Sequence, residues 1–515
     1  MPPRTTSPIR FAPTIWKAIF WTSWAVTAGI AATGQCEAPD NGEAPDNGKA
    51  PNNGETPDDL KQALRRYSMP LIDGERVVGL SVGAIDADRS ATFHAGSATF
   101  EAGTSKGVPP NDQTIYEIGS VSKVFTGLLL AGSVVRGETT LETPAEQWLP
   151  EGVPMPIRGD RPIRLIDLST HRSGLPRLPG NMTTATDADP YATYDSKRLY
   201  EYLRTAKLDR DVGAKTEYSN LGVSLLGHLV ERAAGKSYDD LLAERLAGPM
   251  GMVDTKVRLS DDQVRRIAAP HAALGEPAHR WAFADLPGAG GIHSTMADMM
   301  RFARVHLETG RSENGDADNA NDDQEDDDAD AALTQTIELA YQQHQPARGE
   351  DFAMGLGWHI ARDGQTRWHN GQTGGYHSMV MINRPANIAV VVLSNTATDD
   401  VDAVASTLIR HLAGAPNVEP VQFKGEDKVA AEVLKTYEGK YELIPGYAFD
   451  IRVRGGRLTA QLPGQPRLDV YAKSDTEFEY RVVDATLTFQ RDADGKVTGV
   501  TLFQNGAKQL AKKVE

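Results

Sequence analysis

The chain has 515 residues, enough for two or three domains that each bury a core of their own. Its hydrophobic fraction of 40% and charged fraction of 24% are typical of a globular protein in water. The formal net charge is -16, but two acidic segments, 37–59 and 313–330, carry all of it. The remaining sequence is neutral overall, so it has no field that would attract nucleic acid.

Residues 1–34 are typical of a secretory signal peptide. Basic residues precede an apolar stretch at 18–32, which is shorter than the roughly 20 residues that span a bilayer. We expect export to the periplasm or cell envelope, with cleavage near Gly34. Three alternatives stay open: an uncleaved membrane anchor, an apolar helix of a cytosolic protein, and a lipoprotein modified at Cys36. Gln35 argues against lipidation because a small residue is expected before a lipidated cysteine. With one cysteine, no intramolecular disulfide is expected.

Residues 35–59 contain the repeat EAPDNG-EAPDNG-KAPNNG. This density of proline, glycine and carboxylates leaves no large apolar side chain to bury, which predicts a disordered linker. A calcium-binding repeat is the alternative, but the regular spacing of oxygen ligands that such loops need is missing.

Residues 60–414 predict one α+β domain. In chain order we expect strands at 77–87 and 90–100, helices at 123–136, 220–234 and 294–310, and strands at 372–384 and 387–395. Ser294 is the predicted N-cap of the third helix. Strands at both ends predict one antiparallel sheet that is flanked by helices and built from distant parts of the chain. The acidic run 313–332 predicts a disordered insertion, with a calcium site as the less favoured alternative.

Residues 415–427 are a predicted linker. From 428 to 515 the sequence alternates apolar and polar residues between turn signals such as RGG and DADGK. This pattern predicts an antiparallel β domain, either a small barrel or a sandwich.

Ser120 and Lys123 stand three positions apart at the beginning of the first predicted helix. One Ser-x-x-Lys is expected by chance in a chain of this composition, so the setting matters more than the motif. The helix is apolar on nearly every side, and a buried lysine must be paired or deprotonated. We expect Ser120 at the helix N-terminus and a desolvated Lys123 whose pKa is lowered until it accepts a proton. The alternative is a helix that exposes Lys123 to water.

Two further stretches carry candidate site residues. Tyr218 and Asn220 directly precede an apolar helix in TEYSNLGVSLLG, and His369 and Gly371 lie at a glycine-rich strand entry in WHNGQTGG. Glycines there let the backbone approach a ligand closely. Taken singly, a core tyrosine, a helix-capping asparagine and a structural histidine are the more ordinary interpretations.

Together the three motifs resemble those of serine β-lactamases and penicillin-binding proteins: Ser-x-x-Lys, then Tyr-x-Asn, then Lys-Thr-Gly or its His-x-Gly variant. Tyr-x-Asn is similar to the class C branch, which includes D,D-peptidase and esterase relatives. The resemblance covers roughly residues 70–410 and implies the β-lactamase/transpeptidase-like fold. The C-terminal β domain is similar to the small domains found behind such hydrolases.

The resemblance implies hydrolysis through an acyl-enzyme, with β-lactams, D-alanyl-D-alanine peptides or small esters as substrates. Ser120 is then the nucleophile, and Lys123 and Tyr218 share the acid–base work. The implied substrate-binding residues are Asn220 for the acyl amide, His369 and Gly371 for the strand wall, and Gln372, whose backbone N–H forms the oxyanion hole with that of Ser120. The alternative function is a penicillin-binding envelope sensor or scaffold without efficient turnover.

We expect no cofactor and no metal, because the histidines lack zinc-type spacing. The partners we expect are a small molecule or short peptide, without nucleic acid, and a membrane tether through the N-terminal segment if that segment is retained. His171 is interpreted as structural. His369 replaces the lysine that is common in the third motif, and a histidine with an ordinary pKa near ~6.5 becomes charged only in acid. Carboxylate-bearing substrates are therefore expected to bind weakly at neutral pH.

Overall fold

The computed structural model describes residues 57–514, except 102–105, 183–188, 274, 310–323, 348–351, 424, 426, 455, 464–466, 481–484 and 505–506. The predicted signal peptide and nearly all of the repeat linker lie outside the described residues. The chain forms two compact units, of which one ends at Glu426 and the other begins at Asp427, at the end of the predicted linker. No helix among the described residues is long and apolar enough to cross a lipid bilayer.

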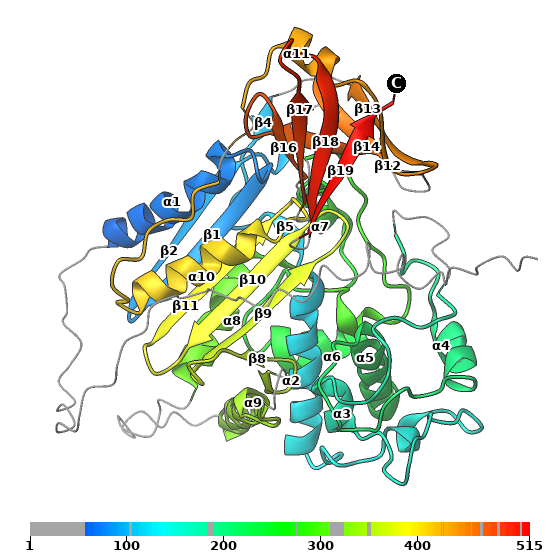
Figure 1. Cartoon of the computed structure of the whole chain (residues 1–515). Helices are drawn as coiled ribbons and strands as arrows, with labels where there is room; N and C mark the ends of the chain where they lie inside the picture. The colour runs from blue at the N-terminus through cyan, green and yellow to red at the C-terminus, as the bar shows by residue number, and fades with distance from the viewer. Residues whose placement is uncertain are drawn as a thin grey trace, which may run out of the picture. The chain divides into compact units, whose positions relative to one another are not determined.

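In the described part of the chain, an antiparallel sheet of seven strands forms the centre of the first unit (Figure 1). Its order is β2-β1-β11-β10-β9-β8-β7. The strands are β1 (Gly79–Asp86), β2 (Arg89–Gly96), β7 (Ala353–Met354), β8 (His359–Ile360), β9 (Thr366–Gln372), β10 (His377–Asn383) and β11 (Ile388–Ser394). β1, from the beginning of the unit, pairs with β11, from its end, so the predicted sheet built from distant segments is confirmed.

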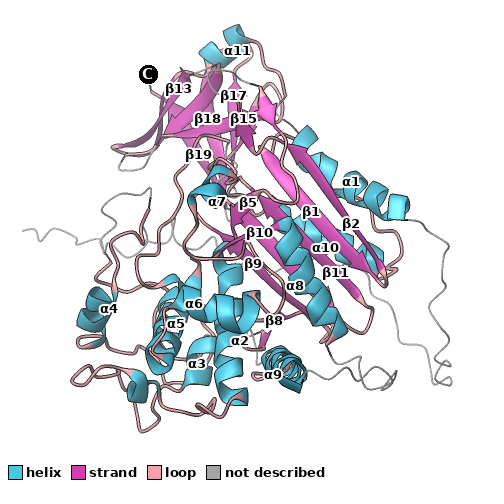
Figure 2. Cartoon of the chain, turned by 180° about the vertical axis from the view of Figure 1, so that it is seen from behind, coloured by secondary structure: helices cyan, strands magenta, loops and turns pink. Residues whose placement is uncertain are grey.

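Both faces of this sheet are buried. Successive side chains of a strand point to opposite faces, and in β11 Val390 packs with one hydrophobic cluster while Val391 packs with the other. α1 (Pro57–Asp73) and α10 (Asp400–Leu412) cover one face. α8 (Met296–Glu308) covers the opposite face, which is seen by comparing Figure 1 with Figure 2. The predicted α+β architecture is confirmed.

Most other helices of the first unit lie between β2 and β7 in the sequence. The elements are β3 (Thr99–Phe100), β4 (Gly107–Val108), β5 (Ile115–Glu117), α2 (Ser122–Val135), α3 (Leu165–Ser169), α4 (Ser196–Leu203), α5 (Asn220–Ala234), α6 (Tyr238–Leu242), α7 (Asp261–Arg265), β6 (His293–Thr295) and α9 (Gln324–Tyr341), with short helical turns at Gly119–Val121, Ala145–Trp148, Ala243–Ala247 and Pro287–Ala289. α2 is buried from Ser122 to Ser133, as its uniformly apolar sequence predicts.

Several predicted boundaries differ from the structure; the predicted strand 372–384, for example, contains the end of β9, a turn and β10. Thr295 caps α8, and the predicted cap Ser294 lies in β6. α9 begins at Gln324, so residues 324–332 of the predicted disordered insertion are helical, whereas the run before them lies outside the described residues. α1 begins at Pro57, inside the predicted linker.

The second unit is a β-barrel. Within its described residues, the strands from β12 to β19 pair in sequence order, and β19 pairs with β12 to close the barrel. They are β12 (Gly439–Ile444), β13 (Tyr447–Arg454), β14 (Arg457–Gln461), β15 (Leu468–Ala472), β16 (Glu477–Glu479), β17 (Ala485–Arg491), β18 (Val497–Gln504) and β19 (Ala507–Lys513), preceded by α11 (Ala431–Thr436). Aromatic rings fill the core, with Tyr437 and Phe489 stacked at 4.0 Å between centroids. Of the two predicted β architectures, the barrel is the one that forms.

Candidate active site

Ser120 lies in a tight turn between β5 and α2. A single 3-10 turn spans Gly119–Val121, and α2 begins immediately afterwards. Gly119 has a φ of +50°, in the left-handed region, and a Cβ on it would lie 2.6 Å from Gln372 N. Only glycine meets both conditions without strain. Because α2 begins at Ser122, Ser120 lies two positions before the first residue of the helix and not within its first turn.

The backbone of Ile292, the residue before β6, supports this turn. Ile118 N donates to Ile292 O over 3.0 Å. Ile292 N donates in return to Ser122 Oγ over 3.1 Å, which explains why a hydroxyl follows the turn at Gly119–Val121, called the nucleophile turn after the predicted role of Ser120. The strand and the turn are thus joined on both sides of Ser120.

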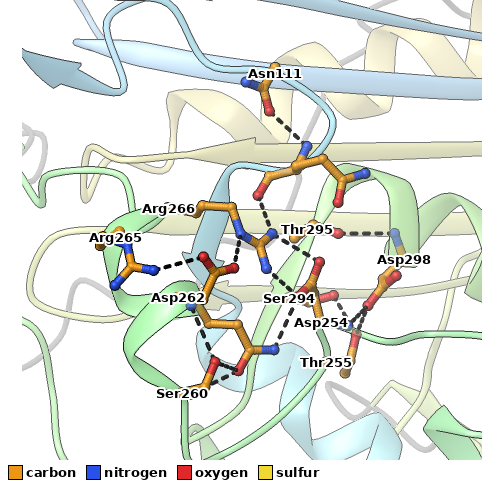
Figure 3. A network of polar contacts seen from close by, with 12 residues as sticks. Asn111, Asp254, Thr255, Ser260, Asp262, Arg265, Arg266, Ser294, Thr295 and Asp298 are labelled. Carbon is orange, nitrogen blue, oxygen red and sulfur yellow. Dashed lines mark hydrogen bonds and ion pairs between the residues drawn. The ribbon is translucent and has the colours of Figure 1, made fainter.

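A network of polar contacts anchors β6 itself (Figure 3). Asp298, in the first turn of α8, accepts from Asp254 N over 2.8 Å and from Thr255 Oγ1 over 2.9 Å. The Thr255 hydroxyl also lies 2.9 Å from Ser294 Oγ in β6. Arg266 binds the Asp254 carboxylate at 2.5 Å. The strand that supports the nucleophile turn is therefore held by the α7 segment and by the start of α8.

Lys123 is completely buried, with 0% of its surface exposed. Its Nζ lies 2.8 Å from Ser120 Oγ and donates to Ala289 O over 2.6 Å. Burial lowers the pKa of Lys123 well below its usual value, and the positive charge of Arg177 lowers it further. A neutral amine donates to the Ala289 carbonyl and keeps its lone pair for the proton of Ser120. The alternative of a water-exposed Lys123 is wrong.

Tyr218 completes the group around Ser120. Its hydroxyl is hydrogen-bonded to Ser120, and Lys123 Nζ lies 4.9 Å from the centre of its ring. Burial raises the pKa of Tyr218, and the hydrogen bond with Ser120 opposes that rise. The phenol is therefore protonated at neutral pH and is available as a proton donor.

β9 passes directly beside the nucleophile turn. A Cβ on Gly371 would lie 2.0 Å from Ile118 O and 2.8 Å from Ser120 N, so only glycine allows this approach. Gln372 N lies against Gly119 in the same contact. The backbone nitrogens of Ser120 and Gln372 therefore belong to two segments that touch, as an oxyanion hole with two donors requires.

His369 lies on the same strand, but it is completely buried, with 0% of its surface exposed. Its Nδ1 lies 2.5 Å from Asn370 O, and its ring centre lies 6.2 Å from that of Tyr218. Burial lowers the pKa of His369 well below its usual value, and the nearby His359 and Lys123 act in the same direction. Burial therefore favours the neutral imidazole, so the ordinary pKa assumed from the residue type does not apply to His369.

Asn220 is the first residue of α5. Ser219, not Asn220, caps the helix, because the Ser219 hydroxyl accepts from Gly222 N over 2.9 Å. Asn220 Nδ2 donates to the hydroxyl of Tyr191 over 2.8 Å, and the Tyr191 ring stacks on Phe283 at 4.5 Å between centroids. The side chain of Asn220 thus joins an aromatic cluster, and its interpretation as a helix cap is wrong.

The family follows from comparison with known proteins. Residues 64–414 match the protein family described as Beta-lactamase, and residues 424–513 match DUF3471, a domain of unknown function. The chain belongs to the β-lactamase family. As a member of this family it is a serine hydrolase of the β-lactamase and D-alanyl-D-alanine carboxypeptidase type.

Individual relatives agree with this assignment. The D-alanyl-D-alanine-carboxypeptidase/endopeptidase AmpH of Escherichia coli strain K12 is 30% identical over 301 residues, which cover 57% of this chain and 72% of the relative. Penicillin-binding protein 4* of Bacillus subtilis strain 168 is 24% identical over 431 residues, or 79% and 89% of the two chains. In fold, the chain is similar to a β-lactamase/D-alanine carboxypeptidase from Yersinia pestis complexed with citrate, with a TM-score of 0.54, 23% identity and coverage of 69% and 98%.

Three residues of this β-lactamase-family site escaped the sequence analysis. Ala289 offers only its backbone carbonyl to Lys123, which no side-chain motif reveals. Arg177 places its guanidinium 5.1 Å from the centre of the Tyr218 ring, and it lies in a loop outside the three motifs. His359, in β8, lies nearly parallel to Tyr218 with 6.4 Å between ring centres.

Buried imidazoles therefore surround Tyr218. His171, interpreted from the sequence as structural, accepts from Ser219 N over 3.2 Å and packs 4.5 Å from the Tyr218 ring. Burial lowers the pKa of His171 well below its usual value and that of His359 to about 3. Across the described residues, no group of three His, Cys, Asp or Glu side chains is arranged to hold a metal ion. The imidazoles form a neutral wall.

Glu117 is a further buried group beside the nucleophile turn. It ends β5, is 3% exposed, and accepts from Trp281 N over 2.9 Å. Burial raises the pKa of Glu117 to about 7. A carboxyl group whose pKa is raised by burial thus lies three residues before Ser120.

Proposed function

We propose that Ser120 forms an acyl-enzyme with D-alanyl-D-alanine peptides, and that β-lactams and small esters enter the same site. The observation that carries the proposal is the fully buried amine of Lys123, 2.8 Å from Ser120 Oγ. A lysine kept neutral by burial acts as a general base at neutral pH. A penicillin-binding sensor also needs acylation, but it does not need turnover. The geometry around Ser120 therefore gives no reason to prefer a sensor over an enzyme.

Acylation begins when Ser120 Oγ attacks the carbonyl carbon of the substrate. Lys123 Nζ accepts the hydroxyl proton, and the hydrogen bond to Ala289 keeps the amine oriented. The backbone N–H groups of Ser120 and Gln372 bind the developing oxyanion, a contribution on the order of 3 kcal/mol for each donor. The Tyr218 hydroxyl protonates the leaving nitrogen and recovers its proton from the Lys123 ammonium. Water then attacks the acyl carbonyl, with the same groups acting in reverse.

Charge in the site supports substrates that carry a carboxylate. The imidazoles around Tyr218 and the Lys123 amine are neutral, whereas the guanidinium of Arg177 is always charged. A guanidinium pairs with a carboxylate through two parallel hydrogen bonds. We therefore assign the terminal carboxylate of the substrate to Arg177. This reverses the expectation, drawn from His369 alone, that carboxylates bind weakly. The similarity to AmpH supports the same substrate class.

The decisive experiment measures acylation and deacylation separately. Stopped-flow kinetics with a chromogenic cephalosporin, a D-alanyl-D-alanine peptide and a p-nitrophenyl ester give both rates for wild type and for Ser120→Ala. We expect a covalent adduct on Ser120, by mass spectrometry of the intact protein and its peptides, and release of product in repeated turnovers. Turnover that persists in Ser120→Ala would exclude this nucleophile. Acylation without product release from any substrate would favour the sensor.

We also propose that the chain is exported to the periplasm or cell envelope. Support comes from the signal-like segment 1–34 and from the repeat at 35–59, which would separate the catalytic unit from the export site. The N-terminus of the protein recovered from cells tests this. A new N-terminus near Gly34 is expected, a lipid on Cys36 would show an anchored form, and an intact N-terminus in the cytoplasmic fraction would refute export.

A further inference from the structure

His377 is a buried imidazole with both ring nitrogens engaged. It lies at the start of β10, with 1% of its surface exposed. Its Nδ1 lies 2.9 Å from Oε1 of Gln372, and its Nε2 lies 2.7 Å from Oδ1 of Asp402 in α10. The imidazoles around Tyr218 differ, because each has a ring nitrogen without a hydrogen-bond partner among the described residues. His377 is therefore a link between two defined groups, not another packing residue.

Asp402 holds the strand at a second point. Its other oxygen, Oδ2, accepts from Asn370 Nδ2 over 2.6 Å. One carboxylate of α10 thus binds Asn370 directly and Gln372 through His377. These two residues flank Gly371, the residue of β9 that contacts the nucleophile turn.

The two faces of β9 have different tasks because side chains alternate along a strand. His369 and Gly371 face the site, whereas Asn370 and Gln372 face α10. In the described part of the chain, β8 pairs only with residues 367–368 of β9, so residues 370–372 have a neighbouring strand on the β10 side alone. This end of the strand must hold its position against Ser120 with pairing on one side only.

We infer that Asp402 and His377 are positioning residues that fix the Gln372 N–H in the oxyanion hole. The inference rests on the proposed function, in which this N–H binds the oxyanion. Neither side chain touches the reacting atoms, so both act through Gln372. A donor displaced by about 1 Å loses much of its effect, which is of the order of a 100-fold rate change. The simpler explanation is that Asp402 only stabilises the first turn of α10 through the helix dipole.

Asp400 provides the matched control. It occupies the same first turn of α10 and therefore has the same dipole effect, but its carboxylate pairs with Arg76 at 2.6 Å. We expect Asp402→Ala and His377→Leu to lower the acylation rate by about 10- to 100-fold, with KM changed by less than about threefold. His377→Gln, whose amide still reaches for Asp402, should recover part of the rate. Asp400→Ala should keep the wild-type acylation rate, even if it lowers the unfolding temperature as much as Asp402→Ala does.

The inhibition constant of a boronic acid distinguishes a positioning role from a purely structural one, because a structural role would leave it unchanged. Its adduct with Ser120 places an oxygen in the oxyanion hole, so its inhibition constant should rise by the same factor by which acylation falls. Equal behaviour of Asp402→Ala and Asp400→Ala, or unchanged boronate affinity, would overturn the inference. A wild type that forms neither an acyl-enzyme nor a boronate adduct would instead overturn the proposed function.

Discussion

Replacement of Gly371 by alanine probes the contact between β9 and the nucleophile turn. The new Cβ would lie 2.0 Å from Ile118 O, about 1.4 Å closer than the 3.4 Å at which ordinary contacts begin. The Ile118 carbonyl is fixed because it accepts from Ser378 Oγ over 2.7 Å. β9 must therefore move by about 1 Å, and Gln372 moves with it. A misplacement of this size costs about 100-fold in rate, or about 2.7 kcal/mol of transition-state stabilisation.

The assay is kcat/KM with a D-alanyl-D-alanine peptide, together with the acylation rate by a fluorescent penicillin. Gly180→Ala is the matched control, since the nearest atom to its new Cβ lies 3.9 Å away and its backbone is not left-handed. Thermal unfolding of both variants sets the temperature at which each is fully folded, and the kinetics are measured there. A folded Gly371→Ala variant with activity within about threefold of wild type would show that β9 can move away from the nucleophile turn without loss of rate, which would refute this prediction.

Four further outcomes are expected. Ser120→Ala should abolish labelling by a fluorescent penicillin and by a fluorophosphonate; a labelled mutant would exclude this serine. Lys123→Ala should slow single-turnover acylation by about 10²- to 10⁴-fold, and an unchanged rate would show that Tyr218 suffices as the base. Glu117→Gln should gain stability over wild type as pH rises from 5 to 8. Burial raises the pKa of Glu117 from 4.5 to about 7, so the folded wild type keeps a proton that its unfolded chain releases. The free energy of unfolding of the wild type therefore falls by up to about 3 kcal/mol between pH 5 and 8. A difference in unfolding temperature between the two proteins that does not change with pH would contradict the buried carboxyl. In a Glu117→Gln background, in which this carboxyl cannot titrate, the ratio of kcat/KM for a penicillin to that for a neutral ester should be flat from pH 5.5 to 8, because burial favours the neutral form of His369. The ratio should fall in Arg177→Gln but less in Arg177→Lys, and an unchanged ratio in the glutamine variant would exclude the guanidinium from carboxylate binding.

Site residues were predicted best from the sequence where they lie close together in one short segment. Ser120 lies in the 3-10 turn and Lys123 in the first turn of α2, only three positions later, so their spacing and the apolar setting predicted that they would lie together. The residues around them were less accessible to prediction. His359 reaches Tyr218 from β8, and Arg177 reaches it from a loop, so both positions depend on how distant segments pack. The neutrality of His369 has the same origin, because its pKa follows from its surroundings and not from its residue type.

Helix boundaries show a second limit. Serine precedes asparagine at the start of α5, and serine precedes threonine at the start of α8, so each site offers two adjacent residues that can cap a helix. Both Ser294 and Thr295 pair across β5 and β6, but the Thr295 hydroxyl accepts from Asp298 N over 3.2 Å, whereas the Ser294 hydroxyl lies 2.9 Å from that of Thr255. At α8 the hydroxyl of the first candidate is thus engaged by Thr255, a residue of a distant segment, and the local sequence does not contain that contact.

The pairing of β1 with β11 means that the sheet of this catalytic unit forms only after residue 394 has been added to the chain. Ser394 Oγ donates to Gly79 O across a separation of 315 residues. Until β11 has been synthesised, β1 and β2 form a hairpin whose free edge is open to wrong partners. Such non-local pairing also forms slowly, because a long stretch of chain must be ordered first. A chain that crosses a membrane unfolded would not yet have a buried Lys123 amine or an oxyanion hole. Its site would stay inactive until β11, the last strand of the sheet, has followed.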